Sequence, residues 1–459
     1  MNTEPTDQQL AGYNRRDFIK GGSVATLMTM LGGVELFAQT NTAPPTDPGI
    51  APPPKVKVAV IGLGSWGREI LNTLAVARQA DVAAICDHYP AFMKRASTAA
   101  PNAKQVEDYK AILADPEIKG VVIASPTHLH KEIAIAALKA GKHVYCEAPL
   151  AHTMEDARAL AKAALAAPEL VFQPGLQMRS DPQNHFVMPF IRSGAIGHPL
   201  LARSQWHKKY SWRASAANPD REKAMNWRLT QATSLGLIGE LGCHPIDQSN
   251  WLLKSRPSAV TASGSILFWD DGRDVPDTVQ ARFEYPSHVC LNYDATLANS
   301  FDASYDMFYG SDAAVMMRDT DKGRKAWLFK EVDSPLLGWE IYARKDNFFE
   351  ETGIALVAGA SKSTQVTTVA PPPFTNTPLS FSLGNFLRNA YDVSNSVQMF
   401  HDTYGDDSTL LAEHLAKIVR QPAATVMDGF AATVAAIKAQ ESMASRQRVE
   451  IKPSDYELA

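Results

Sequence analysis

Cysteine is scarce in this chain, and its placement excludes the structures that cysteine usually builds. The 459 residues contain four, at Cys86, Cys146, Cys243 and Cys290. They lie too far apart for a Cys-x-x-Cys pair or a zinc knuckle, and their spacing does not indicate a disulfide framework. We therefore expect buried or near-site thiols without a metal or redox role, and we predict no metal site.

The chain also lacks an excess of positive charge. Lys and Arg number 45 against 49 Asp and Glu, which gives a formal net charge of −4. Nucleic-acid binding depends on a basic surface that neutralises phosphates, so we expect no nucleic-acid partner. The composition, 45% hydrophobic and 20% charged, is that of a globular protein, and at ~150 residues per domain it predicts two or three domains.

Hydrophobic runs are short as well. The run at the N-terminus, in NRRDFIKGGSVATLMTMLGG and the residues up to about Ala38, barely reaches the ~20 residues that span a membrane, and it is interrupted by Glu35. Arg15 and Arg16 stand before it. This pattern predicts a twin-arginine export signal over residues 1–38, with the twin-arginine translocase as a partner during export.

Export by this route would place the protein in the periplasm. No Ala-x-Ala site precedes Gln39, so a signal that stays uncleaved would tether the protein to the membrane. The route carries folded proteins, typically with a cofactor inserted, which favours a tightly held cofactor. Residues 39–54 are rich in Pro and Thr and predict an extended linker, and the first domain begins near Lys55.

From there the chain alternates between strand and helix patterns. Strand-like segments are VKVAVIGLG, DVAAICD, GVVIASP, HVYCEAP and LVFQPG, and the helical patterns between them are WGREILNTLAVARQA, DYKAILADPE, HKEIAIAALKAG and MEDARALAKAALA. Repeated β-α-β units predict a doubly wound parallel sheet, an α/β domain over residues 55–175. Ligands of such domains bind beyond the carboxyl ends of the strands.

A glycine-rich turn follows the first predicted strand. GLGSWG has the G-x-G-x-x-G spacing of a dinucleotide-binding loop, and its six residues are the first candidate cofactor ligands: Gly62, Leu63, Gly64, Ser65, Trp66 and Gly67. Asp87 ends the second strand, where a carboxylate accepts hydrogen bonds from the adenosine ribose and repels a 2′-phosphate. The pattern therefore predicts NAD and disfavours NADP.

Two later strand ends add polar residues. Ser125 and Thr127 flank Pro126 after the GVVIASP strand, and Glu147 ends the HVYCEAP strand. We expect all three to contact the cofactor. Thr127 is also placed to cap a helix. His130 is a candidate contact on the ribose or nicotinamide side.

Several motifs, in order, resemble those of the Gfo/Idh/MocA oxidoreductases. They include VAVIGLGSWG, ILADPEIKGVVIASPTHLHKEIAIAALKAGKHVYCEAPL, GLQMRSDP and GLIGELGCHPIDQSNWLL. The resemblance implies a Rossmann domain joined to an α+β domain with an open, mostly antiparallel sheet, here residues 176–459. It covers the chain from about residue 56 to the C-terminus, except for residues 330–400. We expect a homo-oligomer formed through the C-terminal sheet.

The segment GLIGELGCHPIDQSNWLL resembles the family's catalytic helix. Glu240 and His244 are four residues apart and Asp247 follows, so one helical face would carry all three. A carboxylate one turn from an imidazole holds its tautomer and raises its basicity, and His244 is the predicted general base. An isolated histidine in a helix is more often a core residue, and the resemblance argues against that here. The family usually has Asp where Glu240 stands.

Ala148 departs from the family pattern, in which the strand end commonly reads Glu-Lys-Pro. The family's lysine hydrogen-bonds the reacting hydroxyl, and alanine cannot. The enzyme would then use His244 with a local substitute, for which the candidates are Tyr210, Lys208, Lys209 and Arg213. Alternatively, it resembles the family's NAD-dependent glycosidases, which oxidise a sugar transiently and then eliminate the aglycone. A third alternative is a cofactor-bound sugar-binding protein without turnover.

The substrate is predicted to be a sugar or glycoside. WHKKYSWRASAANPDREKAMNWRL gathers Trp206, Trp212 and Trp227 with Arg213 and Arg228, a combination that suits stacking on a pyranose and hydrogen bonding to its hydroxyls. The alternative is that these aromatic residues form the interior of the second domain. The candidate substrate ligands are Arg179, Tyr210, Arg213 and Asp247.

Replacing Arg15 and Arg16 together by Lys should hold the precursor in the cytoplasm, because the translocase receptor reads the guanidinium pair. Fractionation and immunoblotting measure this. Undiminished periplasmic protein in a strain that lacks the translocase would exclude this export route.

Overall fold

The computed structural model describes residues 54–216, 218–320, 323–331, 344–346, 353–356 and 377–458. The expected signal, and all of the expected linker except its last residue, lie outside the described residues and stay predictions. None of the described helices is both long and apolar enough to cross a membrane.

The first domain contains a six-stranded parallel sheet with the order β3-β2-β1-β4-β5-β6. The order changes direction at β1, so the carboxyl ends of β1 and β4 flank the crevice where doubly wound sheets bind ligands. The strands are β1 (Val56–Ile61), β2 (Ala80–Cys86), β3 (Lys104–Val106), β4 (Gly120–Ile123), β5 (His143–Cys146) and β6 (Phe172–Pro174).

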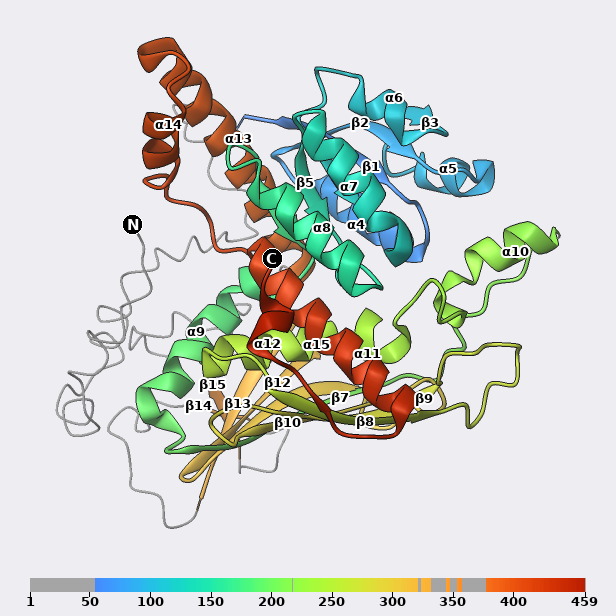
Figure 1. The fold of residues 1–459 in the computed structure, drawn as a ribbon, viewed down its shortest axis with the longest axis vertical. Helices are drawn as coiled ribbons and strands as arrows, with labels where there is room; N and C mark the ends of the chain where they lie inside the picture. Colours follow the sequence, from blue (N-terminus) through green and yellow to red (C-terminus); the bar gives the residue numbers. More distant parts are fainter. Residues whose placement is uncertain are drawn as a thin grey trace.

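The central strands are apolar because helices cover both faces of the sheet. Val58, Ala59 and Val60 of β1 are each fully buried, as expected for a parallel strand between two helical layers. The helices of the domain are α4 (Ser65–Val76), α5 (Pro90–Ala96), α6 (Tyr109–Leu113), α7 (His130–Lys139) and α8 (Met154–Leu165), with a 3₁₀ turn η1 (Thr127–Leu129). Figure 1 shows this domain in blue and cyan.

The second domain contains a broad sheet that runs β14-β15-β13-β12-β11-β7-β10-β9-β8-β16 among the described residues. Strands β7 and β10 pair in parallel, and the other neighbours pair antiparallel. The strands are β7 (Pro199–His207), β8 (Ala259–Ser265), β9 (Thr278–Glu284), β10 (Cys290–Thr296), β11 (Ser304–Gly310), β12 (Ala313–Thr320), β13 (Gly323–Lys330), β14 (Arg344–Asp346), β15 (Gly353–Leu356) and β16 (Val449–Glu450). The predicted fold class is therefore confirmed.

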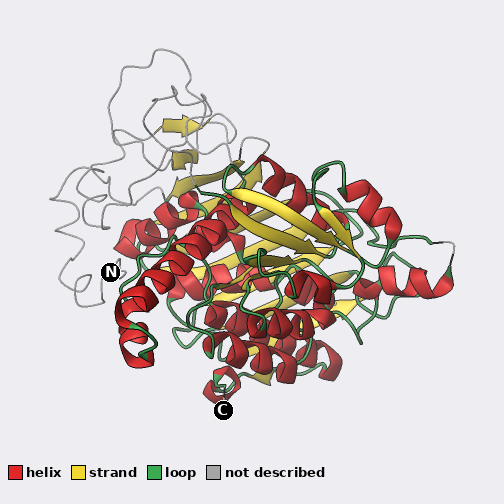
Figure 2. Cartoon of the chain, turned by 90° about the horizontal axis from the view of Figure 1, so that it is seen from above, coloured by secondary structure: helices red, strands yellow, loops and turns green. Residues whose placement is uncertain are grey.

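Helices of the second domain fill the space between the two sheets (Figures 1 and 2). Helix α15 packs against both α8 of the first domain and β8 of the second, and the amide of Leu150 donates to Thr433 Oγ1 at 3.0 Å across that junction. The helices and turns are η2 (Gln177–Ser180), α9 (Pro182–Phe190), η3 (Ile191–Ala195), α10 (Pro219–Met225), η4 (Trp227–Leu229), α11 (Gly236–Glu240), α12 (Cys243–Leu253), α13 (Pro378–Tyr404), α14 (Ser408–Leu415), α15 (Val426–Ser445) and η7 (Pro453–Tyr456).

Helix α13 joins the Rossmann core although it lies late in the chain. Leu383, Phe386 and Leu387 are fully buried in one hydrophobic cluster with β1 and α4. Ser394 Oγ also lies 2.7 Å from Nε2 of His143, at the start of β5. A division at residue 175 therefore separates α13 from the sheet that it covers.

Replacing Phe386 by Ala should destabilise the first domain, because the ring is fully buried and packs edge-on against Tyr145 with centroids 5.7 Å apart. The expected loss is about 3–5 kcal/mol in the free energy of unfolding, measured by urea denaturation. Met399→Ala is the control on the same helix, since Met399 is 68% exposed. Equal unfolding midpoints for the two variants would contradict the packing described here.

Candidate active site

A cavity of about 1590 Å³ lies between the strand ends of the first domain and the second domain. This exceeds the roughly 300–1,000 Å³ of a typical small-molecule pocket, so it has room for more than one ligand. Its walls come from both domains: the glycine loop, Asp87 and the ends of β4 and β5 on one side, and α10, η4, His244 and β11 on the other.

The glycine loop has the geometry that dinucleotide binding requires. Gly62 has a φ of 92°, and a Cβ there would lie 2.6 Å from the amide nitrogen of Ser125. A Cβ on Gly67 would lie 1.9 Å from the carbonyl oxygen of Gly62, so that position brings helix and strand together. A Cβ on Gly64 meets nothing within 4 Å. Because Gly64 caps α4 without a side-chain hydrogen bond, the first amides of the helix stay available for a phosphate.

Asp87 lines the cavity beside this loop and organises it. Its two carboxylate oxygens accept hydrogen bonds from the backbone amides of Leu63 and Tyr89, both at 2.8 Å. Leu63 was predicted to contact the cofactor, but its side chain is fully buried and its amide is committed to Asp87. Leu63 therefore shapes the loop, whereas Ser65 and Trp66 line the cavity.

Glu147 and Ala148 line the cavity at the end of β5. Burial raises the pKa of Glu147 to about 7, and a hydrogen bond from the Trp66 side chain, the Ala148 amide and the charge of Arg228 oppose that rise. Glu147 Oε1 has no hydrogen-bond partner among the described residues. A Cβ on Gly175 would lie 2.5 Å from Glu147 Oε2, so the glycine leaves room for this carboxyl group.

Ser125, Thr127 and His130 take different roles at the end of β4. Ser125 Oγ is buried without a hydrogen-bond partner in the described protein, at a point that lines the cavity. Thr127 Oγ1 lies 2.9 and 3.1 Å from the two carboxylate oxygens of Glu240 and donates to that group, so it links the two domains.

His130 is buried, and its two ring nitrogens lie 3.0 Å from the carbonyl oxygens of Pro149 and Ser125. Burial lowers the pKa of His130 to about 4. The neutral ring has one N–H, which donates to one of these two carbonyl oxygens. His130 also lines the cavity, and its contact with the cofactor stays a prediction.

Glu240 and His244 do not share one helical face as predicted. Helix α11 ends at Glu240 and α12 begins at Cys243, with Leu241 and Gly242 between them. A Cβ on Gly242 would lie 2.3 Å from the carbonyl oxygen of Ile238, which makes glycine necessary at this turn. The Glu240 carboxylate accepts from Thr127 and from Ser234 Oγ at 2.9 Å, so its role is to join the domains.

His244 is half-buried and lines the cavity. Burial lowers its pKa to about 4, and the negative charge of Asp306 opposes this shift. The imidazole is therefore neutral at pH 7 and able to accept a proton. Asp306 takes the electrostatic role that the sequence assigned to Glu240, and its own carboxylate accepts from Ser204 Oγ at 2.7 Å and from Gln248 Nε2 at 3.0 Å.

Arg179 and Asp247 were predicted to bind substrate, but the structure pairs them with each other. Arg179 donates to both carboxylate oxygens of Asp247 at 2.8 and 2.9 Å, and it also lies 3.0 Å from Asp428. Neither residue belongs to the cavity wall, and the Asp247 side chain is 2% exposed. This arrangement supports a structural role, because α12 is anchored by a bidentate ion pair.

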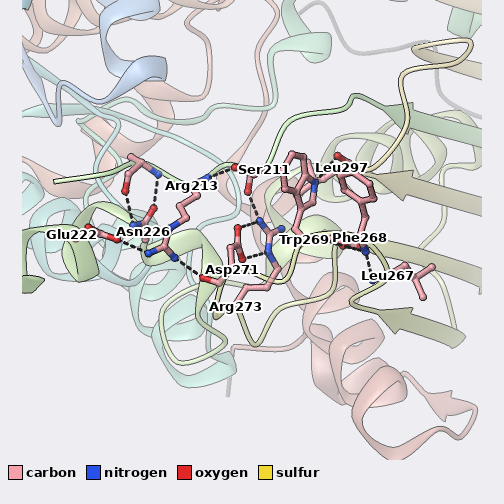
Figure 3. A network of polar contacts seen from close by, with 12 residues as sticks. Ser211, Arg213, Glu222, Asn226, Leu267, Phe268, Trp269, Asp271, Arg273 and Leu297 are labelled. Atoms are coloured by element: carbon pink, nitrogen blue, oxygen red, sulfur yellow. Dashed lines mark hydrogen bonds and ion pairs between the residues drawn. The ribbon is translucent and has the colours of Figure 1, made fainter.

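The aromatic residues of the second domain reach the cavity. Trp206, Trp212, Trp227 and the half-exposed Tyr210 line it. Arg213 does not line it, since its guanidinium pairs with Glu222 and donates to the carbonyl oxygen of Asp271 (Figure 3). The contact between Tyr210 and the substrate therefore stays a prediction, whereas the position of Arg213 does not support a contact with the substrate.

Sequence reasoning did not assign catalytic roles to three buried polar residues on the wall, Asp306, Gln248 and Arg324. Arg324 donates to Asp306 at 2.5 Å and to Gln248 at 3.1 Å. Asp306 and Arg324 come from β11 and β13, which carry no recognisable motif, so only the pairing of the strands brings them to the cavity.

The residues present fit a bound dinucleotide. The glycine loop has backbone amides at the start of α4 and open space beside Gly64 for a phosphate, and Asp87 has carboxylate oxygens on the cavity wall. Ser125 Oγ and Glu147 Oε1 are buried polar atoms without a hydrogen-bond partner among the described residues. Fold and site together define a two-domain dinucleotide-binding protein whose second domain closes the binding crevice.

The chain belongs to the Gfo/Idh/MocA family. Residues 56–173 match the family described as "Oxidoreductase family, NAD-binding Rossmann fold", and residues 187–315 match the "GFO/IDH/MocA C-terminal domain". The first domain is therefore an NAD-binding Rossmann domain.

Known relatives agree with this assignment. The chain is 35% identical over 147 residues to levoglucosan dehydrogenase of Pseudarthrobacter phenanthrenivorans, covering 32% of this chain and 36% of that protein. It is 29% identical over 243 residues to inositol 2-dehydrogenase of Acidothermus cellulolyticus, covering 53% and 66%. These matched segments span less than two thirds of each relative.

Among solved structures, a levoglucosan dehydrogenase in complex with NADH and levoglucosan has the same fold. Its TM-score is 0.62 at 20% sequence identity, and the match covers 86% of this chain and 99% of that chain.

Asp87→Ala should weaken the binding of NAD far more than that of NADP, because the lost carboxylate would repel a 2′-phosphate. Asp87→Asn keeps one acceptor oxygen for the Leu63 or Tyr89 amide and should give an intermediate loss. Titration calorimetry with both cofactors measures the affinities. An equal loss for NAD and NADP would exclude the ribose role of Asp87.

Proposed function

We propose that this protein is an NAD-dependent oxidoreductase that oxidises a secondary hydroxyl group of a sugar or glycoside. The observation that carries the proposal is one cavity lined jointly by the dinucleotide loop, Asp87 and the neutral imidazole of His244. Relatives named as levoglucosan and inositol dehydrogenases support a polyhydroxylated substrate.

The chemistry divides between cofactor and protein. NAD, when bound, accepts a hydride from the carbon that carries the hydroxyl group. His244 accepts the hydroxyl proton, and the negative charge of Asp306 stabilises the imidazolium that results. Trp206, Trp212 and Trp227 present ring faces for stacking on the sugar.

A second candidate is an NAD-dependent glycosidase, and Ala148 is the observation that favours it. In this reaction, oxidation of the sugar acidifies a neighbouring C–H bond, the aglycone leaves by elimination, water adds and the hydride returns to the sugar. No net reduction of NAD would accumulate. The cavity volume of about 1590 Å³ leaves room for an aglycone beside the cofactor.

Mass spectrometry of the products of one aryl glycoside, together with absorbance of reduced cofactor, separates the two reactions. The dehydrogenase yields an oxidised glycoside and stoichiometric NADH, whereas the glycosidase yields free aglycone without NADH. Bound NAD with neither product would support a sugar-binding protein without turnover.

We also propose that the protein acts in the periplasm. The paired Arg15 and Arg16 before a short apolar run support this, and glycosides that enter from outside the cell would be its substrates there. Assembly through the C-terminal sheet is proposed on the family resemblance.

His244→Ala should lower turnover by ~10²-fold or more, the usual effect of losing a general base, and leave NAD affinity nearly unchanged. In the wild type, kcat/KM should fall as the pH decreases toward about 4, because protonation of His244 removes the base, and the variant should lack this dependence. His198→Ala at an exposed loop position is the control. Full activity of His244→Ala would reject this mechanism.

A further inference from the structure

Arg228 is a cation on the cavity wall, and none of the described acidic residues forms an ion pair with it. It lies on η4, is half-buried, and its guanidinium carbon is 4.5 Å from the ring centroid of Trp227 and 5.9 Å from that of Trp212. Among the described residues, no ion pair or hydrogen bond engages this guanidinium. Two aromatic faces therefore hold the charge while its N–H groups stay available to a ligand.

The turn that carries Trp212 is fixed by its surroundings. Trp212 has a φ of 64°, an unfavourable conformation for a bulky residue that persists only when neighbouring contacts impose it. Figure 3 shows those contacts. Arg273 donates to the carbonyl oxygen of Ser211 at 2.5 Å, and Asn226 exchanges two hydrogen bonds of 2.7 Å with the backbone of Ala214.

This network places one aromatic face of the Arg228 site before any substrate arrives. The carboxylate of Asp271 accepts hydrogen bonds from Arg273 at 2.6 and 2.7 Å, and its carbonyl oxygen accepts one from Arg213. The two arginines therefore share one partner. The arrangement preorganises the Arg228 cation, which is the condition under which a fixed charge contributes most to a reaction.

Arg228 lines the same cavity as His244 and the end of β5, where Glu147 and Ala148 lie. It lowers the pKa of Glu147 and of Glu240 against the larger effect of burial, which raises both. Glu147 immediately precedes Ala148, where the family commonly has lysine. Of the four substitutes expected from the sequence, Tyr210 lines the cavity, whereas Lys208, Lys209 and Arg213 do not.

We propose that Arg228 is a catalytic residue that donates a hydrogen bond to the oxygen of the reacting hydroxyl, and so supplies the positive charge that Ala148 cannot. This inference rests on the proposed function. As the carbon loses hydride to the bound cofactor, the O–H proton passes to His244 and the C–O bond becomes a carbonyl. Arg228 gives up no proton.

His244 and Arg228 would have different roles in this step, as proton acceptor and as hydrogen-bond donor. Burial makes His244 a weak base, so the hydroxyl must become a stronger acid for the proton to leave. A guanidinium at the oxygen does this because it stabilises the developing negative charge. A single donor of this kind typically contributes about 10²–10³-fold to kcat.

Arg228→Met tests the assignment, since it keeps an unbranched apolar stem and removes the guanidinium group. We expect kcat to fall about 10²–10³-fold with a small change in KM, and NAD affinity measured by calorimetry to stay within about threefold. Added guanidinium chloride at millimolar concentration should restore part of kcat. The double variant Ala148→Lys with Arg228→Met should recover activity if the ammonium reaches the same oxygen.

Arg256→Met is the matched control, because Arg256 also lies over an aromatic ring, with its guanidinium carbon 5.2 Å from the ring centroid of Tyr456, and does not line the cavity. Unchanged kcat in Arg228→Met, a parallel loss of NAD affinity, or an effect confined to KM would overturn the inference. A loss of kcat that is restored neither by added guanidinium nor by Ala148→Lys would also overturn the inference.

The proposed function is tested separately by His244→Ala. If that variant is inactive, the proposed function stands whatever the outcome for Arg228, whereas full activity of His244→Ala would remove the basis of the proposed function and of the role of Arg228.

Discussion

The buried carboxylate of Glu240 is the contact on which the site depends. It accepts from Thr127 of the first domain and from Ser234 of the second, so one charged group spans the junction above the cofactor crevice. Burial raises its pKa, and the hydrogen bonds and Arg228 limit that rise. A carboxylate in this position holds the two walls of the cavity at a fixed separation, because leaving any buried donor or acceptor unpaired would be costly.

Charge balance in the cavity follows from the same burial. The charge of Arg228 lowers the pKa of Glu147 and of Glu240, although no described residue forms an ion pair with it, and burial keeps the imidazole of His244 neutral while Asp306 opposes that shift in its pKa. In a site partly closed to water these charges interact more strongly than they would at the surface. The arrangement suits a reaction in which a hydroxyl proton and a hydride leave one carbon together, since each developing charge meets a fixed charge of opposite sign.

The fold could be predicted because it depends on local patterns. Continuous β-branched strands, helical periodicity and the glycine spacing each specify an element by themselves, and together they specify the parallel sheet. The same holds for Asp87, whose place at the end of β2 follows from the order of elements. Prediction failed where a contact joins distant segments: α13 covers the Rossmann sheet, and Arg179 pairs with Asp247, 68 positions away.

By itself the sequence determined the Rossmann domain, the dinucleotide loop, the position of His244 and the absence of lysine at Ala148, because each is a property of one short segment. Tertiary structure alone decided which groups surround His244. The break at Leu241 and Gly242 turns Glu240 toward Thr127, and strand pairing places Asp306 on the cavity wall that His244 also lines. The network around Asp271 holds Trp212 beside Arg228. Such neighbours are set by packing between elements, and spacing along a helix cannot reveal them.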